Sequence, residues 1–381
     1  MRLSMISAAL VAALVGFGST IALVLAAAAA VGASPAQTAS WVTTICLVKA
    51  LGSAFLSTRA RVPVVLAWST PGAALIAATQ GLTMAEAVGA FLLAGALIAA
   101  SGAIKPLGAL ISRIPDALAS AMLAGVLLPF CLKGFAAAPP LGLAAAAMIA
   151  TFALVRLKNP ALAVLAALAM GLIAAFWGAP PSLSFSLPEL TFIPPAFSTQ
   201  ALIGLGLPLY LVTMASQNLP GFATQRAAGY EPQVAPALIT TGGLSALGAL
   251  FGAHTISMAA ITAAICMGDD VHPDRSQRWK VGLLYALAWV LLGLLSPEAI
   301  ALLRQLPAEI LTLLVGLALL GPLTGALTGA FAAAPPQRFA ATITLTVTAS
   351  GLSLLGVGAA FWGLLAGLAV LALDRLSPKR P

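Results

Sequence analysis

Two apolar segments constrain this chain more than any other feature: RVPVVLAWSTPGAALIAATQ at 61–80 and ALFGAHTISMAAITAAICMG at 249–268. Each begins with a β-prone run and continues with residues that favour a helix. In the first segment, Ser69 and Thr70 can cap a helix and Pro71 suits its first turn. A segment that changes structure halfway leaves backbone groups unpaired, and lipid cannot satisfy them. Both segments are therefore expected to be buried in protein or to line a cavity.

Composition places the chain in a membrane. Of its 381 residues, 61% are hydrophobic and only 7% are charged, whereas a soluble domain carries about 25% charged residues. The net charge of +8 comes from basic residues that are scattered singly, so no patch for nucleic acid exists. Cys46, Cys131 and Cys266 have no metal-ligand or disulfide spacing. We expect a polytopic helical membrane protein with no metal, cofactor or nucleic-acid partner.

Windows of about 20 apolar residues predict fourteen transmembrane segments. The first seven lie near 5–31, 37–57, 61–80, 85–103, 116–135, 141–158 and 160–178. The second seven lie near 199–219, 232–251, 253–268, 279–296, 306–330, 339–354 and 357–374. Two sets of seven imply an inverted repeat. The expected division is 1–178 for the first repeat, 179–198 for an extracytoplasmic connector and 199–381 for the second repeat.

An internal similarity supports this division. The run KPLGALISRIPDALASAMLAGVLLP at 105–129 resembles SPEAIALLRQLPAEILTLLVGLALLGP at 296–322. The matched pairs are Pro106 with Pro297, Arg113 with Arg304, Pro115 with Pro307, Gly125 with Gly316, and Pro129 with Pro322. The two interrupted segments match at a similar offset, which makes shared composition a weaker explanation.

The loop charges predict the orientation, because cytoplasmic loops carry an excess of Lys and Arg. With the N-terminus inside, the outer side carries only Lys133 and Arg304, and Lys49 falls within a span. Both termini are therefore expected in the cytoplasm of a bacterial cell, with the protein in the inner membrane. The basic residues on the cytoplasmic side are then Arg2, Arg59, Arg61, Lys105, Arg113, Arg156, Lys158, Arg226, Arg275, Arg278, Lys280, Arg338, Arg375, Lys379 and Arg380.

Interrupted spans in corresponding halves indicate the substrate site of a secondary transporter. Half-helices bring free N–H groups and positive dipole ends to the middle of the bilayer, where an anion can bind. The sequence therefore favours a transporter of anions.

Four strings carry a more specific resemblance: PVVLAWSTPGAALI at 63–76, IPDALASAMLAGVLL at 114–128, TMASQNLPGFA at 213–223 and FGAHTISMAAITAAICMG at 251–268. They resemble the benzoate:proton symporter family over nearly the whole chain. The resemblance implies the fold of nucleobase:proton symporters and sulfate permeases, with short strands of spans 3 and 10 crossing near the midplane. It also implies a core domain of spans 1–4 and 8–11, a gate domain of spans 5–7 and 12–14, and a possible homodimer.

The chain departs from this family in its first span. LVLAAAAAVGAS at 23–34 is apolar up to Ser34, where relatives often carry glutamines. Relatives that carry nucleobases have acidic residues on spans 8 and 10, and the matching positions are Gln217 and His254. The function implied is proton-coupled uptake of benzoate or a similar aromatic carboxylate. Another anion or a nucleobase is the alternative within transport.

His254 is the candidate for proton coupling. It is one of two histidines and begins the strand-prone part of the second interrupted segment. Histidine titrates near neutral pH, and an ionisable residue inside a membrane is costly to bury. The alternative is a neutral, hydrogen-bonded core histidine. Asp116 and Glu309 are reserve candidates, although each follows a proline at a helix start, where a carboxylate complements the helix dipole.

The candidates for substrate binding are amides and hydroxyls at membrane depth, and capping or helix packing is the alternative role for each. They are Ser69, Thr70, Gln217, Asn218, Thr255, Ser257 and Thr262.

The run DDVHPD at 269–274 has a rival meaning. Aspartate-rich motifs hold Mg²⁺ and diphosphate in intramembrane prenyltransferases, but those enzymes need two motifs and this chain has one. A solvated loop is the favoured interpretation, and the chain is not expected to be an enzyme.

Overall fold

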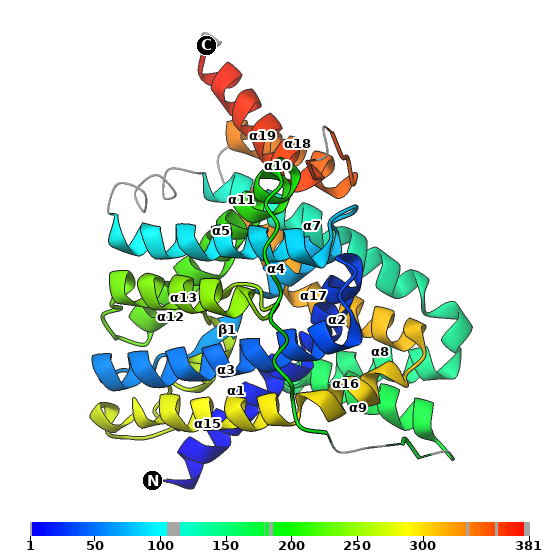
Figure 1. Ribbon diagram of the computed structural model, residues 1–381, viewed down its shortest axis with the longest axis vertical. Helices are drawn as coiled ribbons and strands as arrows, with labels where there is room; N and C mark the ends of the chain where they lie inside the picture. Colours follow the sequence, from blue (N-terminus) through cyan, green and yellow to red (C-terminus); the bar gives the residue numbers. More distant parts are fainter. Residues whose placement is uncertain are drawn as a thin grey trace.

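The computed structural model describes residues 2–104, 115–178, 180–182, 186–332, 335–354 and 357–376, with only the backbone for 335–336 and 375–376. The first ten residues of the repeated run at 105–129, with Lys105, Pro106 and Arg113, lie outside these ranges, as do Lys379 and Arg380. Figure 1 shows a mainly helical molecule.

The first half of the chain holds a strand between helices. Its elements are α1 (Leu3–Gly18), α2 (Ile21–Ala30), α3 (Pro35–Ala60), β1 (Leu66–Trp68), α4 (Thr70–Ala77), α5 (Met84–Ala103), α7 (Asp116–Ala136), the 3₁₀ turn η1 (Pro139–Leu141), α8 (Leu143–Lys158) and α9 (Ala163–Phe176).

The second half follows the same plan. Its elements are α10 (Thr199–Ala201), η2 (Leu202–Gly206), α11 (Leu207–Thr213), η3 (Met214–Asn218), α12 (Leu219–Ala227), α13 (Val234–Ala249), β2 (Ile256–Met258), α14 (Ile261–Ile265), η4 (Arg275–Gln277), α15 (Lys280–Leu294), α16 (Ser296–Arg304), α17 (Ala308–Phe331), α18 (Pro335–Ala349) and α19 (Ala359–Leu376).

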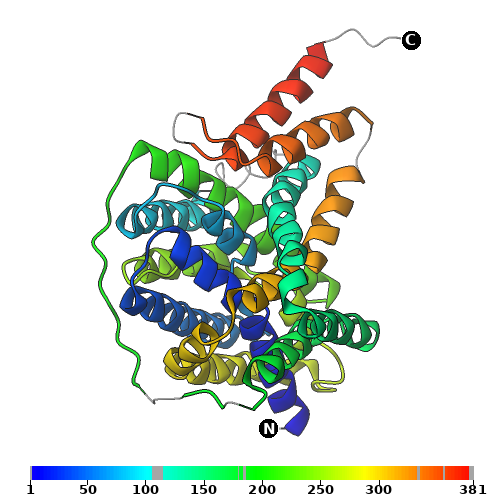
Figure 2. The same ribbon diagram turned by 90° about the vertical axis from the view of Figure 1, so that its right-hand side faces the viewer.

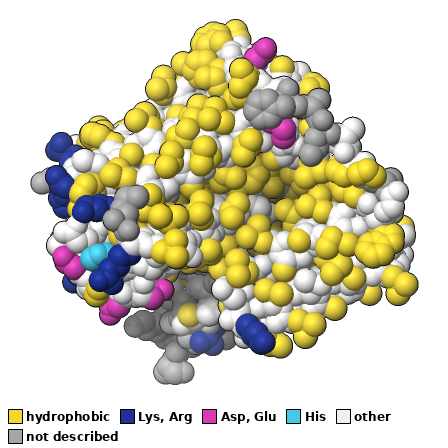
Figure 3. Space-filling view, turned by 90° about the horizontal axis from the view of Figure 1, so that it is seen from below, with side chains coloured by type: hydrophobic (Ala, Val, Ile, Leu, Met, Phe, Trp, Pro, Cys, Tyr) yellow, Lys and Arg dark blue, Asp and Glu magenta, His cyan; other side chains and the backbone are white. Residues whose placement is uncertain are grey.

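Each predicted transmembrane segment contains a helix or a strand followed by a helix, which confirms the fold class. Among the described residues, six helices are long and apolar enough to cross a membrane by themselves, or seven if α15 and α16, bent by 54°, form one span. Figure 3 shows a largely hydrophobic face with most of its Lys and Arg side chains near one edge, as expected of a surface that contacts lipid.

Local signals explain where the helices of the first half begin and end. Ser34 and Gln37 form a capping box at the start of α3, and Pro35 occupies its first turn. Arg61, in the left-handed conformation with φ 55°, ends the same helix. At α4, the Ser69 hydroxyl accepts a hydrogen bond from the Gly72 N–H. The predicted helix start at Ser69 is therefore confirmed.

The predicted end of one span at 219 is wrong, because the helical path from Thr199 continues to Ala227. Two π-helical segments, η2 and η3, lie in this path, and each ends two residues before a proline, Pro208 or Pro220. A proline lacks the N–H and clashes with the carbonyl four residues earlier. The wider π turn accommodates both prolines without ending the helix.

The two strands pair antiparallel and confirm the predicted crossing. Leu66 pairs with Met258, Ala67 with Ser257 and Trp68 with Ile256. The central pair differs by 190 positions (257 − 67), close to the offset of the sequence repeat. Two further hydrogen bonds lengthen the ladder, from the Ser69 N–H to the Thr255 carbonyl and from the Ala259 N–H to the Val65 carbonyl.

Side-chain hydroxyls form hydrogen bonds with the backbone groups at the outer edges of this ribbon. The Ser53 hydroxyl accepts from the Leu66 N–H at 3.1 Å, and the Ser245 hydroxyl accepts from the Ile256 N–H at 2.9 Å. These two contacts are equivalent under the repeat. The Tyr285 hydroxyl donates to the Leu66 carbonyl at 2.8 Å. Irregular backbone is tolerated at membrane depth only when protein groups pair with it in this way.

The long helices pack in pairs that the repeat relates. α3 packs on α15, and α5 packs on α13. The repeat offset carries α3 onto α13 and α5 onto α15, so it exchanges the two pairs. Figure 1 shows α5, α13, α3 and α15 stacked with nearly parallel axes. A second group is formed by α7, α17, α18 and α19, with α8 against α9.

The segment between the halves has no regular structure over 186–198. It runs along the outside of the molecule (Figure 2) and is held by backbone contacts, including the Ile193 N–H to the Leu250 carbonyl at 2.8 Å. Another contact joins the Ala196 N–H to the Ala85 carbonyl at 2.9 Å.

The contact between α5 and α13 leaves no room at Gly242. A Cβ built there would lie 2.2 Å from the Ala99 nitrogen and 2.6 Å from the Gly95 oxygen, whereas a Cβ at Gly243 would meet nothing within 4 Å. We expect Gly242→Ala to lower the stability by about 1–3 kcal/mol, because backbone atoms must move. The measurement is thermal unfolding of the purified protein.

Gly243→Ala is the matched control, since it makes the same chemical change one residue away. It should be neutral, or stabilising by up to about 1 kcal/mol from helix propensity. Equal melting temperatures for the two variants would contradict this packing.

Candidate functional site

A cluster of hydroxyl groups lies where α4 leaves the strand ribbon. The Thr213 hydroxyl donates to the Ser69 hydroxyl oxygen at 3.0 Å and lies 2.9 Å from that of Thr255. All three residues are fully buried. The cluster joins α11 to both strand ends, so two predicted residues, Ser69 and Thr255, meet there. Thr213 is a member that the sequence did not reveal, because nothing distinguishes it from other threonines in apolar helices.

Thr70 opens α4 and faces a different neighbour. Its hydroxyl lies 3.0 Å from that of Thr20, at the break between α1 and α2. Phe17, one turn before Thr20, packs on Trp68 with ring centroids 5.8 Å apart. The first half-helix therefore begins beside the break in the first span.

His254 is fully buried, with a partner at each ring nitrogen. The indole N–H of Trp41 lies 2.9 Å from Nδ1, and Nε2 lies 3.2 Å from the Ser69 carbonyl oxygen. An indole nitrogen only donates, so Nδ1 accepts and Nε2 carries the hydrogen. This arrangement fits the neutral imidazole, because a second ring N–H would point at the Trp41 N–H.

Gln217 and Asn218 end the π-helical segment η3. The Asn218 side-chain oxygen accepts from the Met258 N–H at 2.9 Å, so this amide completes the ribbon edge. Gln217 is half-buried. The sequence predicts the same role for both residues, whereas the structure gives Asn218 a backbone partner in β2.

Two further candidates lie on β2 and α14. Ser257 is fully buried, and its hydroxyl has no hydrogen-bond partner among the described residues. Thr262 is buried near α1, since a Cβ at Gly16 would lie 3.9 Å from its methyl carbon and 3.1 Å from the Trp289 ring.

Asp116 and Glu309 lie apart from these groups. Each is exposed in the first turn of its helix, α7 or α17, directly after a proline. These positions match the helix-dipole alternative.

Lys49 is an ionisable residue inside a span to which the sequence analysis gave no role. It is fully buried in α3, and its Nζ lies 4.2 Å from the Trp68 ring centroid and 2.9 Å from that of Trp289. No described acceptor is within hydrogen-bonding distance of this nitrogen. Phe17 packs on both indoles, at centroid distances of 5.8 and 6.2 Å. We call Phe17, Trp68 and Trp289 the aromatic cage of Lys49.

The cage compensates only part of the cost of burying an ammonium group. A desolvated cation over an indole face gains about 2 kcal/mol. Taking an ion out of water costs several kcal/mol, and a carboxylate or a polar acceptor normally offsets that cost. The sequence shows a single lysine in an apolar helix, which is a signal for a special role. It does not show the partners of this lysine, because Trp68 and Trp289 come from distant segments.

A cavity lies between two groups of helices. Its volume is about 350 Å³, and its lining comes from α4, α7, the start of the α10 helix, α18 and α19. Lys133, at the exposed end of α7, is part of its wall. A much smaller space of about 10 Å³ lies between Asp116, Ala215 and Leu364.

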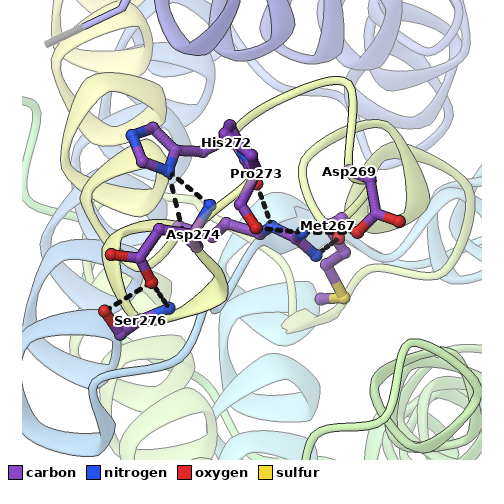
Figure 4. Close-up of polar contacts among 7 residues, drawn as sticks. Met267, Asp269, His272, Pro273, Asp274 and Ser276 are labelled. Carbon is purple, nitrogen blue, oxygen red and sulfur yellow. Dashed lines mark hydrogen bonds and ion pairs between the residues drawn. The ribbon is translucent and has the colours of Figure 1, made fainter.

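Figure 4 shows polar contacts within the DDVHPD loop, and Arg278 makes several contacts to this loop. This buried guanidinium donates to the carbonyls of Met267 and His272 and pairs with Asp269 at 2.5 Å. Hydrogen bonds from Ser276 hold the pKa of Asp274 below its usual range. No group of three metal-binding side chains occurs among the described residues. Asp269 and Asp274 therefore have structural partners in a loop.

Solved structures share this fold. The transmembrane domain of the cyanobacterial bicarbonate transporter BicA aligns with a TM-score of 0.60 at 14% identity, covering 98% of each chain. The murine anion transporter Slc26a9 in its inward-facing state gives 0.67 at 12% identity, covering 99% of this chain and 68% of that one. These neighbours are consistent with the predicted inverted repeat.

The family model and the curated relatives identify a membrane transporter rather than an enzyme. The chain belongs to the benzoate membrane transport protein family, whose model matches residues 1–373. It is 39% identical over 364 residues to the inner membrane protein YdcO of Escherichia coli, covering 94% of this chain and 93% of that protein. It is 33% identical over 370 residues to a benzoate membrane transport protein of Acinetobacter baylyi, covering 96% and 94%. The family resemblance is confirmed.

Proposed function

We propose that this protein is a proton-coupled symporter that takes up benzoate or a similar aromatic monocarboxylate across the bacterial inner membrane. Membership of the benzoate membrane transport family is the observation that carries the proposal. The buried polar groups at the strand crossing are suited to an anion, because they offer hydroxyls and the start of a half-helix. Moving an anion inward against a negative-inside potential costs about 2.3 kcal/mol per 100 mV, so coupling to a proton makes uptake favourable.

The proposed mechanism moves a core domain, spans 1–4 and 8–11, against a gate domain, spans 5–7 and 12–14. The packing supports this division, because α3, α5, α13 and α15 form one group and α7, α17, α18 and α19 another. If both termini are cytoplasmic, the cavity of about 350 Å³ between these groups opens to the outside. Lys133 in its wall then attracts an anion toward the site.

Uptake into proteoliposomes tests the function. The purified protein should accumulate labelled benzoate when the outside is acidic, and accumulation should stop when an ionophore collapses the gradient. Uracil and sulfate serve as competing substrates. Uptake of either one in preference to benzoate would contradict the proposed substrate class.

We assign substrate contact to Gln217, a half-buried residue of η3, the segment that contacts β2. Gln217→Ala should weaken benzoate binding by about 1.5–3 kcal/mol, the cost of losing a hydrogen bond to a charged group. Thermal stabilisation by benzoate, titrated over concentration, measures this change. Unchanged affinity in the variant would make Gln217 a packing residue.

We assign proton coupling to His254. A proton on Nδ1 would oppose the Trp41 N–H and break that contact, so protonation would free the chain before β2. His254→Gln retains hydrogen bonding but cannot titrate. It should abolish accumulation driven by a pH gradient while benzoate exchange persists.

Gradient-driven accumulation and benzoate exchange are measured on the same vesicles. Exchange serves as the control, because it shows that the variant is folded. Gradient-driven accumulation that survives in His254→Gln would remove His254 from the coupling mechanism. Asp116 and Glu309 would then be tested in the same way.

A further inference from the structure

The aromatic cage of Lys49 contains donors without acceptors. Lys49 Nζ and Trp289 Nε1 are both buried, and neither has a hydrogen-bond partner among the described residues. The Trp289 indole packs on the Tyr285 ring, with ring centroids 5.9 Å apart. Native interiors rarely leave two neighbouring donors unpaired. An acceptor carrying negative charge would satisfy both.

The cage adjoins the start of the first half-helix. Trp68 is the last residue of β1, and Ser69 caps α4 directly after it. Phe17 brings the break of the first span to the same place, because Thr20 lies one turn further and contacts Thr70. Thr70, in the first turn of α4, therefore adjoins the aromatic cage through α1.

The ribbon separates this region from the hydroxyl cluster. Successive side chains of a strand point to opposite faces. Trp68 lies on the face of Lys49, and Ser69 lies on the face of Thr213. The cationic group and the aromatic rings are thus together on one face.

We propose that Lys49 binds the carboxylate of the transported aromatic acid and that Trp68 and Trp289 contact its ring. This inference rests on the proposed function. When the anion enters, the ammonium and the Trp289 N–H bind its oxygens, and the aromatic ring packs edge to face with the indoles.

Binding of benzoate and its neutral analogue benzamide to the purified protein tests the proposal. Lys49→Met removes the charge and retains most of the side-chain volume. It should weaken benzoate binding about tenfold to a hundredfold and change benzamide binding by less than about threefold. Its melting temperature should not fall, because a buried amino group without a hydrogen-bond partner is removed. Lys280→Met, the same change at the start of α15, is the matched control and should bind benzoate normally.

A second measurement covers the case in which Lys49→Met does not fold. Benzoate should change the tryptophan emission of the native protein, and Trp289→Phe should remove most of that change while preserving ring packing. Native benzoate affinity in Lys49→Met, or an undiminished emission change in Trp289→Phe, would overturn the proposal and leave the proposed function intact. If the native protein binds no benzoate, the proposed function and this inference both fail.

Discussion

Backbone hydrogen bonding at membrane depth is the constraint on which this structure depends. Two chain segments stop being helical inside the membrane, and each must find partners for its N–H and C=O groups away from water. They find them mainly in one another, through the antiparallel pairing of β1 with β2. Ser53, Ser245, Asn218 and Tyr285 complete the edges. The surrounding helices are therefore positioned around a short ribbon that they also protect.

The two faces of the ribbon carry different side chains. On one face, hydroxyls of Ser69, Thr213 and Thr255 bind each other and fix the strand ends. On the other face, Lys49 lies among aromatic rings, and its Nζ has no hydrogen-bond partner among the described residues. An aromatic carboxylate matches this second face in two ways. Its negative charge can pair with Lys49, and its flat apolar ring can pack on the aromatic side chains. The family of the chain and the chemistry of this face thus support the same substrate class.

The sequence predicted the elements that depend on local signals. Interrupted spans were recognisable because β-prone residues precede the Ser69–Pro71 helix start, and their pairing followed from a family resemblance. The sequence could not predict contacts between distant segments. The continuation of the helix past Pro220 is one such case, since the π-helical turn that accommodates this proline depends on packing. Lys49 received no role, because its cage combines residues from three other elements.

The central claim is that the substrate binds at the strand crossing. Crystals soaked with 4-bromobenzoate test it directly, because anomalous scattering locates the bromine without reference to the protein. The account predicts a bromine peak in van der Waals contact with Trp68 or Trp289, with the carboxylate density toward Lys49. A bromine peak confined to the cavity lined by Lys133, or to the lipid-facing surface, would contradict it.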